Sequence, residues 1–253
     1  GRVMIMTDQD HDGSHIKGLV MNVFHHMWPS LLELGFITSM ITPIVKVSLK
    51  NKMKSFYTLT EYNDWLKKTK NSKSWKTKYY KGLGTSTAKE AREYFSDIKM
   101  NNYIYDEATN DSMSLAFSKD KSDLRKKWLY GFDEKVILDH NAVDVTIPDF
   151  INKELIHFSN SDTLRSIGSL YDGLKPSQRK ILYSCFKRKL YSEIRVAQLA
   201  GYVSENAAYH HGEASLQSAI IGMAQDYIGS NNINLLMPNG QFGTRIMGGH
   251  DSA

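Results

Sequence analysis

The chain opens with a short apolar run, an acidic segment and a longer stretch of helical periodicity. The apolar run "VMIM" at residues 3–6 favours a β-strand. Apolar side chains then recur at three- and four-residue spacing, namely Ile16, Leu19, Val20, Val23, Phe24 and Met27. This spacing predicts an amphipathic helix that ends near Pro29 and buries these side chains. The order is therefore strand, acidic loop, helix.

Strand and helix patterns continue to alternate up to about residue 95. Strand-like runs occur in "FITSMITPIVKVSL", "SFYTLT" and "WKTKYY", and a helical pattern follows in "AKEAREYFSDI". Thr87 stands three residues before Glu90, which is the spacing of a capping box. Alternation of this kind favours an α/β layered fold. The next segment, residues 97–144, is mixed in charge and predicts a connector with one helix around "KSDLRKKWL".

From "IPDFINKELIHFSNSD" onward the pattern is mainly helical. Pro176 is well placed for the first turn of a helix over "PSQRKILYSCFKRK". Two further helices are expected in "EIRVAQLAGYVSENAAYHH" and "GEASLQSAIIGMAQDYIG", with a break at residues 210–212. Two helices joined by a short turn have the form of a helix-turn-helix.

Composition narrows the class of protein. With 253 residues, of which 41% are apolar and 23% charged, the chain can bury a sizeable core and is long enough for two domains. No apolar run is long enough to span a membrane, and no signal segment stands at the start. Cys185 is the only cysteine, which excludes an internal disulfide framework. The start at Gly1 and the end at "GGHDSA" lead us to expect a piece of a longer protein.

The acidic segment carries Asp8, Asp10 and Asp12 at every second position. The spacing is that of a calcium-binding EF-hand loop, but the twelfth position holds Leu19 rather than Glu, and a strand precedes the loop instead of a helix. In an open α/β sheet, ligands bind at the carboxyl ends of strands. Mg²⁺ fits best, because it takes few carboxylates and shares its other positions with phosphate oxygens. The alternative is a solvated acidic turn that caps the following helix.

Positive charge is concentrated in two stretches, although the whole chain carries only +5. Residues 46–81 contain eleven Lys against two acidic residues, and residues 165–195 contain eight Lys or Arg against two. Basic surfaces beside a carboxylate cluster suit an enzyme that acts on a polyanion such as DNA. Ordinary solvated lysine faces are the alternative. The nine His show no ligand spacing and only one Cys is present, which argues against a zinc site.

Several stretches together resemble the DNA-breakage core of a type IIA DNA topoisomerase of the eukaryotic kind. They are "TDQDHDGSHIKG", "ITPIVKV", "YYKGLGTSTAKEA", "DFINKEL", "FSNSD", "DGLKPSQRK", "AQLAG", "YHHGE" and "QFGTRIMGGHDSA". They follow the order found in the family and cover nearly the whole chain apart from residues 97–144. The resemblance implies a Toprim domain, which has a Rossmann-like α/β fold, followed by a mainly helical winged-helix domain. The overall class is then multidomain α+β.

The resemblance also implies roles for single residues. Asp8, Asp10 and Asp12 match the Mg²⁺ ligands of the Toprim domain, in a two-metal site that a glutamate upstream of Gly1 would complete. The family positions that stabilise the scissile phosphate fall on Arg165, Lys175 and His211. Supporting DNA contacts fall on Lys81, Arg179, Lys180 and His210.

The same family makes a transient double-strand break through 5′-phosphotyrosyl links, passes a second duplex through it and religates the break. Its catalytic tyrosine would come after Ala253, so residues 1–253 alone are expected to be inactive. The resemblance further implies a homodimer, a nuclear location, double-stranded DNA as partner, no membrane association, and ATP use by a domain outside this chain.

The expected domains are a Toprim part at 1–96, a connector at 97–147 and a winged-helix part at 148–253. Two other functions stay open. Another Toprim-type enzyme of nucleic acids would keep the acidic loop, but it would not need "DGLKPSQRK" or "YHHGE". A DNA-binding module without catalysis would carry the aspartates as spectators.

Overall fold

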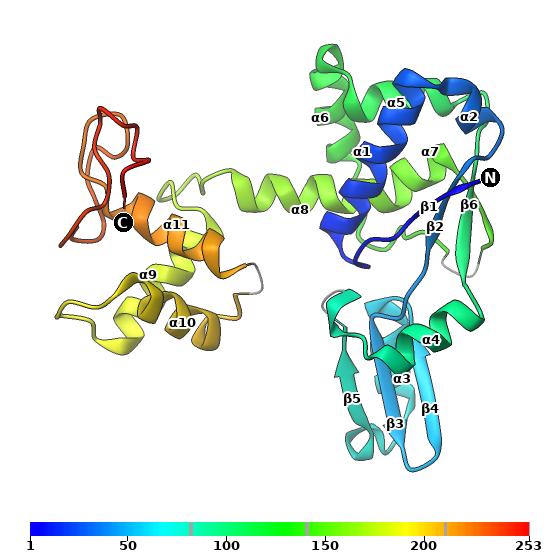
Figure 1. Ribbon diagram of the computed structural model, residues 1–253, viewed down its shortest axis with the longest axis horizontal. Helices are drawn as coiled ribbons and strands as arrows, with labels where there is room; N and C mark the ends of the chain where they lie inside the picture. Colours follow the sequence, from blue (N-terminus) through cyan, green and yellow to red (C-terminus); the bar gives the residue numbers. More distant parts are fainter. Residues whose placement is uncertain (81–82, 140–141, 210–211, 253) are drawn as a thin grey trace. The chain divides into compact units, whose positions relative to one another are not determined.

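Two β-sheets with helices packed on them organise the first part of the chain (Figure 1). The computed structural model describes residues 1–80, 83–139, 142–209 and 212–252. The chain divides into two units, Gly1–Ser161 and Asp162–Ala253. The division falls within helix α8 (Ile156–Ser166).

The first sheet has the strand order β1-β2-β6-β7. Its strands are β1 (Val3–Ile5), β2 (Ile37–Met40), β6 (Met100–Ile104) and β7 (Asp144–Thr146). β1 runs parallel to β2, β2 antiparallel to β6, and β6 parallel to β7. Residues 97–147, for which we expected a connector with one helix, thus supply two strands of this sheet and two α-helices, α5 and α6.

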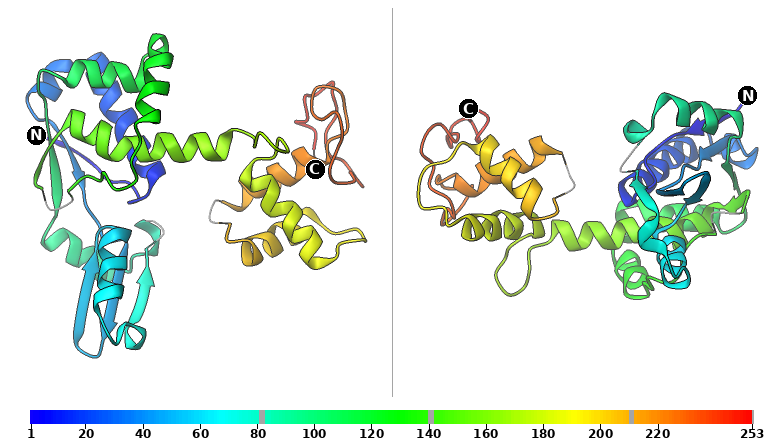
Figure 2. Two further views of the ribbon diagram at one scale, coloured as in Figure 1. Left: turned by 180° about the vertical axis from the view of Figure 1, so that it is seen from behind. Right: turned by 90° about the horizontal axis from the view of Figure 1, so that it is seen from below.

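Helices pack around this sheet in both views of Figure 2. They are α1 (His11–Met27), α2 (Pro29–Glu33), α5 (Thr109–Phe117), α6 (Ser122–Tyr130) and α7 (Ile147–Phe150), with the 3-10 turn η3 (Lys119–Lys121). After α7 comes a π-helical turn, η4 (Ile151–Leu155), which leads into α8. The core between sheet and helices includes Met21, Tyr103, Met113 and Phe150, each almost fully buried.

The buried face of α1 differs from the predicted one. Val20 and Phe24 pack on the core as expected. However, Ile16, Leu19, Val23 and Met27 are 44–58% exposed. The face that is buried carries Gly13, Ser14, Lys17, Gly18 and Met21. The small residues explain this choice: a Cβ on Gly18 would lie 3.0 Å from the Phe117 ring and 3.3 Å from Leu155, so the helix approaches its neighbours closely.

The second sheet is antiparallel, with the order β4-β3-β5. It consists of β3 (Val45–Leu49), β4 (Lys52–Phe56) and β5 (Lys76–Tyr79), with helices α3 (Leu59–Lys68) and α4 (Ala88–Ser96) and the 3-10 turns η1 (Ser72–Ser74) and η2 (Leu83–Thr85). Its small core joins Val45, Val47, Phe56 and Tyr62. The strands predicted within residues 36–49 and 75–80 are confirmed. The strand predicted in "SFYTLT" is wrong: β4 ends at Phe56, and Thr58 caps the helix α3 that begins at Leu59.

The second unit is helical in its described part, where no strand occurs. It contains α9 (Pro176–Arg188), α10 (Val196–Asn206) and α11 (Glu213–Ala224). Ile181, Val203 and Leu216 form the centre of its core. The two helices predicted on either side of residues 210–212 are thereby confirmed, as is Pro176 in the first helical turn. Among the described residues, no helix is both long and apolar enough to cross a membrane.

The Glu90 carboxylate connects β5 to α4 and completes the predicted capping box. Thr87 accepts a hydrogen bond from the Glu90 amide, and Glu90 accepts from the Thr87 amide at 2.8 Å. The same carboxylate accepts from Tyr80 Oη and pairs with Lys78 Nζ at 2.8 Å. Burial disfavours its ionised form, but the bonds from Lys78, Thr87 and Tyr80 outweigh it and lower the pKa of Glu90 from 4.5 to about 2. Burial and the bond to Glu90 raise the pKa of Tyr80.

We expect Glu90→Gln to lower the free energy of unfolding at pH 7. A carboxyl whose pKa is depressed in the folded state stabilises it above the unfolded pKa, and this contribution is lost as the pH falls through the folded pKa. The difference between wild type and variant should therefore amount to at most about 3 kcal/mol at pH 7 and shrink between about pH 5 and pH 2. Denaturant unfolding across this range measures it. Glu93→Gln is the control, because its exposed carboxylate lies 3.9 Å from Lys46. A difference that does not change with pH would contradict the role given to ionised Glu90.

Candidate functional site

The acidic loop lies where two parallel strands of the first sheet end. It follows β1 directly, and Gln9 Nε2 donates to the Met40 carbonyl at the end of β2, at 3.0 Å. Because β1 and β2 are parallel, their carboxyl ends meet at one edge of the sheet. The predicted position of the loop is confirmed.

Asp10 has a structural task in this loop. Its side chain accepts a hydrogen bond from the Gly13 amide at 2.8 Å and forms the N-cap of α1. Asp12 lies in the first turn of the helix, where a negative charge is favourable because of the helix dipole. The sequence left open whether these aspartates hold a metal ion or cap the helix, and the structure shows that Asp10 caps it.

The loop folds closely over the start of the helix. A Cβ on Gly13 would lie only 1.9 Å from the Asp8 carbonyl oxygen. Only glycine allows this approach without moving the backbone. The position of the Asp8 carbonyl, and with it the shape of the whole loop, therefore depends on Gly13.

Beneath the loop lies a buried group of polar side chains that the sequence did not predict. Glu154 accepts a hydrogen bond from Ser14 Oγ at 2.7 Å and forms an ion pair with Lys17 Nζ. The side chains of Lys17 and Glu154 are 6% and 12% exposed. Lys17 Nζ also lies 5.7 Å from the centre of the Phe150 ring. No local signal reveals this pair, because its members are 137 residues apart.

Aromatic contacts join the start of α1 to α8. The ring of His15 stacks on Phe158 with a centroid distance of 4.0 Å, and His11 lies stacked at 6.0 Å from His157. The His157 ring also meets the Phe132 ring edge-on, and its Nε2 lies 2.9 Å from the Val136 carbonyl. These contacts hold the first turn of α1 against a second helix.

The donor set of the loop fits Mg²⁺ in kind. Asp8, Asp10 and Asp12 offer only oxygen atoms, and Mg²⁺ is often held by one or two protein carboxylates. The buried hydroxyl of Thr7 beside them has no hydrogen-bond partner. Within the described parts of the chain, however, no three His, Cys, Asp or Glu side chains converge as metal ligands would. The assignment of all three aspartates to a metal site stays a prediction.

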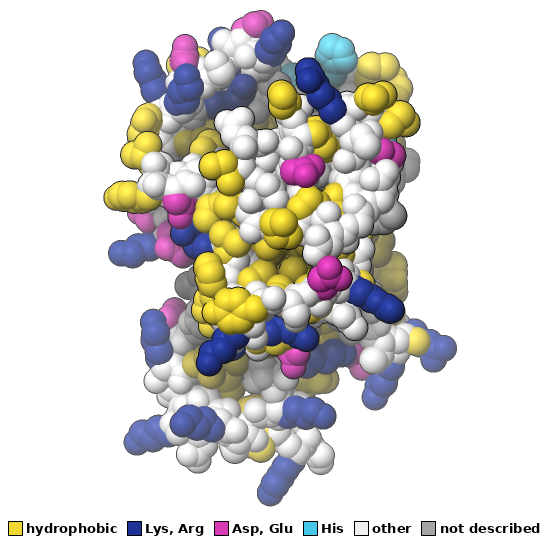
Figure 3. Space-filling model, turned by 90° about the vertical axis from the view of Figure 1, so that its left-hand side faces the viewer, with side chains coloured by type: hydrophobic (Ala, Val, Ile, Leu, Met, Phe, Trp, Pro, Cys, Tyr) yellow, Lys and Arg dark blue, Asp and Glu magenta, His cyan; other side chains and the backbone are white. Residues whose placement is uncertain are grey.

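Most basic side chains of residues 46–81 are exposed where the structure describes them. Lys50, Lys52, Lys54, Lys67, Lys68, Lys70, Lys73 and Lys76 all lie at the surface. Lys46 differs, because it is buried against the Tyr94 ring at 4.6 Å and lies 3.9 Å from Glu90. Lys81, a predicted DNA contact, lies outside the described residues. Figure 3 shows exposed Lys and Arg side chains at many points of the face that it draws, among hydrophobic and other polar side chains.

In the second unit, the predicted basic residues have local partners. Arg179 forms a two-bond ion pair with Asp172, at 2.7 and 2.9 Å. Arg165 Nε lies 3.3 Å from Asp162. Lys180 donates to the Ala208 carbonyl at 2.7 Å and so ties α9 to the turn after α10.

The start of α9 is defined by Lys175, the N-cap residue, whose amide donates to Gln178 Oε1 at 2.9 Å. Lys175 is exposed to solvent. The predicted basic residues of this unit therefore lie at the end of α8 and around the start of α9. They are Arg165, Lys175, Arg179 and Lys180. His210 and His211 lie outside the described residues.

A short turn carries Asp172 and precedes α9. The Ser169 amide donates to the Leu174 carbonyl at 3.0 Å, and the Gly173 amide donates to the Ser169 carbonyl at 2.8 Å. Gly173 has φ +71°, in the left-handed region that favours glycine. The bond from Arg179 and the bond from the Leu174 amide lower the pKa of Asp172. This turn therefore presents an ionised carboxylate to Arg179.

Residues 241–252, the described part of the motif "QFGTRIMGGHDSA", form a closed loop. Asp251 accepts from the Thr244 amide at 2.8 Å, and the Gly249 amide donates to the Thr244 carbonyl at 3.0 Å. Gly243 approaches so closely that a Cβ on it would lie 2.6 Å from the Gly249 Cα. Gln225 Nε2 joins this loop to the end of α11 through the Phe242 carbonyl.

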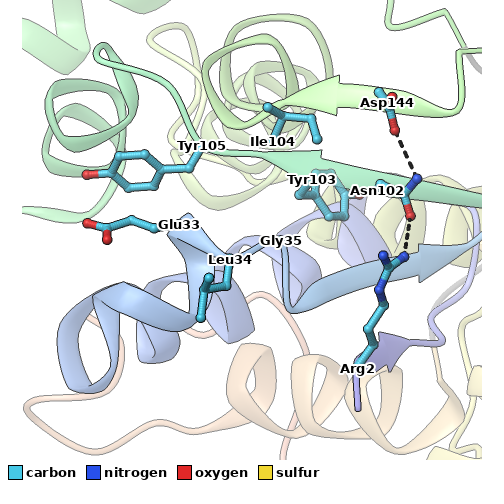
Figure 4. A pocket seen from close by; sticks show the side chains of 9 residues that line it. All are labelled: Arg2, Glu33, Leu34, Gly35, Asn102, Tyr103, Ile104, Tyr105 and Asp144. Atoms are coloured by element: carbon cyan, nitrogen blue, oxygen red, sulfur yellow. Dashed lines mark hydrogen bonds between the residues drawn. The ribbon is translucent and has the colours of Figure 1, made fainter.

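A shallow pocket of about 300 Å³ lies beside β6 and β7, and none of the predicted site residues lines it. Figure 4 shows Asn102 between Arg2 and Asp144, which it joins by hydrogen bonds of 3.3 and 2.9 Å. The bond to Asp144 links β6 to its neighbour β7, and the bond to Arg2 links β6 to the residue just before β1.

Comparisons with known proteins place the two units in known families. Residues 40–163 match the model of the "C-terminal associated domain of TOPRIM", and residues 165–253 match a model of "DNA gyrase/topoisomerase IV". The chain is 58% identical to "Probable DNA topoisomerase 2" of Dictyostelium discoideum over 99% of its length, which is 17% of that protein. It is 54% identical to human "DNA topoisomerase 2-alpha" over its whole length, which is 18% of that protein.

A solved structure is similar as well. The "Plasmodium falciparum topoisomerase II DNA-binding, cleavage and re-ligation domain" matches with a TM-score of 0.80 and 53% identity. The match covers all of this chain and 35% of that one. The chain thus spans about a sixth of the curated relatives named above.

Because a Cβ at residue 13 collides with backbone, we expect Gly13→Ala to destabilise the first unit by about 1–3 kcal/mol or more. Gly201→Ala is the matched control: Gly201 also lies in a helix, and a Cβ there meets nothing within 4 Å. That change should stabilise the protein by about 0.5–1 kcal/mol. Calorimetric unfolding measures whether Gly13→Ala lowers the stability and whether Gly201→Ala raises it. Equal stability of Gly13→Ala and wild type would show that the loop can relax, against the conclusion above.

Proposed function

The chain belongs to the type IIA DNA topoisomerase family, and on this premise we propose that it forms part of a DNA-breakage core. The proposed reaction is a transient double-strand break, passage of a second duplex and religation, with double-stranded DNA as substrate. The observation that carries the proposal is the acidic loop at the carboxyl ends of β1 and β2, in a chain with two basic stretches. The solved relative, which is named for DNA binding, cleavage and re-ligation, supports it.

The finer fold assignment belongs to the same proposal. Residues 1–96 would belong to a Toprim domain and residues 148–253 to a winged-helix domain, with residues 97–147 between them. The match of residues 40–163 to a Toprim-associated model supports the first part. Helices α10 and α11, joined by a short turn, support the second.

Each group of residues has a task in the proposed reaction. Asp8, Asp10 and Asp12 would hold Mg²⁺, which supplies positive charge close to DNA phosphates. Arg165, Lys175 and His211 would stabilise negative charge that develops on the scissile phosphate. Arg179, Lys180, His210 and Lys81 would hold the flanking backbone, because phosphate contacts supply most of the affinity for DNA.

The attacking tyrosine of the family corresponds to no residue of this chain in the resemblance described above. Residues 1–253 alone would therefore bind DNA but not cut it. A homodimer in the nucleus, with ATP used by another domain, completes the proposal. Among the relatives is a protein of Dictyostelium discoideum named "DNA topoisomerase 2, mitochondrial".

We expect Asp10→Asn in the full-length protein to remove most of the Mg²⁺-dependent DNA cleavage, roughly 10²-fold, and to leave DNA binding nearly unchanged. Asparagine caps helices as well as aspartate, so the variant loses a charge and keeps the start of α1. Single-turnover cleavage and DNA affinity are measured together. Asp111→Asn, in the first turn of α5, is the control. Equal losses of cleavage and binding, or wild-type cleavage by Asp10→Asn, would contradict a role at the metal. Absence of cleavage by the wild-type protein itself would favour the DNA-binding module without catalysis.

A second prediction concerns salt. The affinity for duplex DNA should fall steeply as the salt concentration rises, and Arg179→Ala should make the log–log slope shallower by roughly one unit, as expected when one phosphate contact is lost. Lys126→Ala is a matched control, since this exposed lysine also pairs with an aspartate at 2.8 Å but lies outside both basic stretches. Filter binding over a range of salt concentrations gives both slopes. If Arg179→Ala and Lys126→Ala give the same slope as wild type, residues 165–195 are an ordinary solvated surface.

A further inference from the structure

We propose that Glu154 is a positioning residue for the acidic loop: it fixes the start of α1 so that Asp8, Asp10 and Asp12 can bind Mg²⁺. Nothing in the sequence motifs assigns it this role. The inference rests on the proposed function, since it concerns the metal-binding step of the same site.

A continuous series of hydrogen bonds connects Glu154 to the loop. Glu154 accepts from Ser14 Oγ at 2.7 Å, and the Ser14 amide donates to the Asp10 carbonyl at 3.1 Å. Asp10 in turn accepts from the Gly13 amide. The backbone of Asp10 and its capping side chain are therefore held through Ser14. A change at Glu154 would be transmitted to the loop without any direct contact with a metal ion.

The burial of the ion pair points to a role in positioning. Lys17 and Glu154 are both largely removed from water. Moving two charges out of water carries a desolvation penalty that their attraction only about offsets, so a buried ion pair is a poor source of net stability. An apolar pair of similar size would stabilise this core at least as well. What the ion pair adds is direction, because it fixes α1 against the helical segment α7–η4–α8 at one register.

The local geometry around Glu154 is unusual as well. It lies in the π-helical turn η4 (Ile151–Leu155), between the α-helical segments α7 and α8. A π turn inserts an extra residue and shifts the side chains that follow it around the helix axis; such turns are frequent at functional sites. In the same helix, Asp149 and Lys153 form an ordinary exposed pair at 2.8 Å, spaced i, i+4. The two pairs provide a natural comparison between a buried and a surface ion pair.

The first test is a titration of the full-length protein with Mn²⁺ alone, followed by electron paramagnetic resonance, without DNA. Glu154→Gln should weaken Mn²⁺ binding at the loop by roughly 10–100-fold, the range for loss of a group that orients metal ligands. Ser14→Ala, which keeps the ion pair, should weaken it by a smaller factor. Asp149→Asn is the matched control and should bind like wild type. DNA affinity in metal-free buffer should be unchanged in all three.

A double variant separates positioning from folding. Lys17→Met with Glu154→Met replaces the ion pair by apolar side chains, so it should keep or raise the melting temperature and still bind Mn²⁺ more weakly. If Glu154→Gln does not fold, the Mn²⁺ affinity of this double variant tests the positioning role of Glu154. Wild-type Mn²⁺ affinity in the double variant, or in a folded Glu154→Gln, would overturn the inference.

The same titration distinguishes failure of the proposed function. If wild type and Asp10→Asn bind Mn²⁺ equally, the acidic loop is not the metal site, and both proposals fail. If Asp10→Asn loses binding while Glu154→Gln does not, only the role of Glu154 is wrong.

Discussion

Burial of a lysine is the constraint on which the first unit is built. Among the described residues, two lysines are buried, one beside each sheet: Lys17 and Lys46. An unpaired buried ammonium is very unfavourable, so each must find a carboxylate with good geometry. Lys17 finds Glu154, and Lys46 lies near Glu90 and Glu93 of α4 and against the ring of Tyr94. In both cases the glutamate comes from a helix, so the pairing fixes which helix covers which part of the unit.

Local patterns predicted the order of the elements well. The strand before the acidic loop, the capping box at Thr87 and the break between α10 and α11 all depend on neighbouring residues, and all are confirmed. The buried face of α1 depends on its surroundings instead. Periodicity favoured the larger apolar side chains, but close approach to Phe117 and Leu155 selects the face with Gly18. Strands β6 and β7 were missed for a related reason, since their pairing partners are distant in sequence.

The candidate site could be predicted as a list of residues, but not as a set of contacts. Sequence motifs identify Asp10 and Arg179 as site residues, because each lies in a stretch that resembles the topoisomerase family. They cannot show that Asp10 caps α1 or that Arg179 pairs with Asp172, because both facts depend on backbone geometry. Glu154 was not found at all. Its role depends on a π turn and on partners more than a hundred residues away, and neither leaves a local pattern.

The charges of the two units are arranged according to different requirements. In the first unit, the ion pair beneath the acidic loop is buried, so water and salt screen it little and its geometry is fixed. In the second unit, Arg165 and Arg179 pair with aspartates at the surface, where ion pairs contribute little net free energy and salt weakens them. A guanidinium held in this way keeps a defined direction, yet it can exchange its carboxylate for a phosphate oxygen with little loss. Rigid support beneath the carboxylates and exchangeable pairs around the arginines are what the proposed function requires, since in it a metal ion is bound in one geometry while DNA contacts form and break.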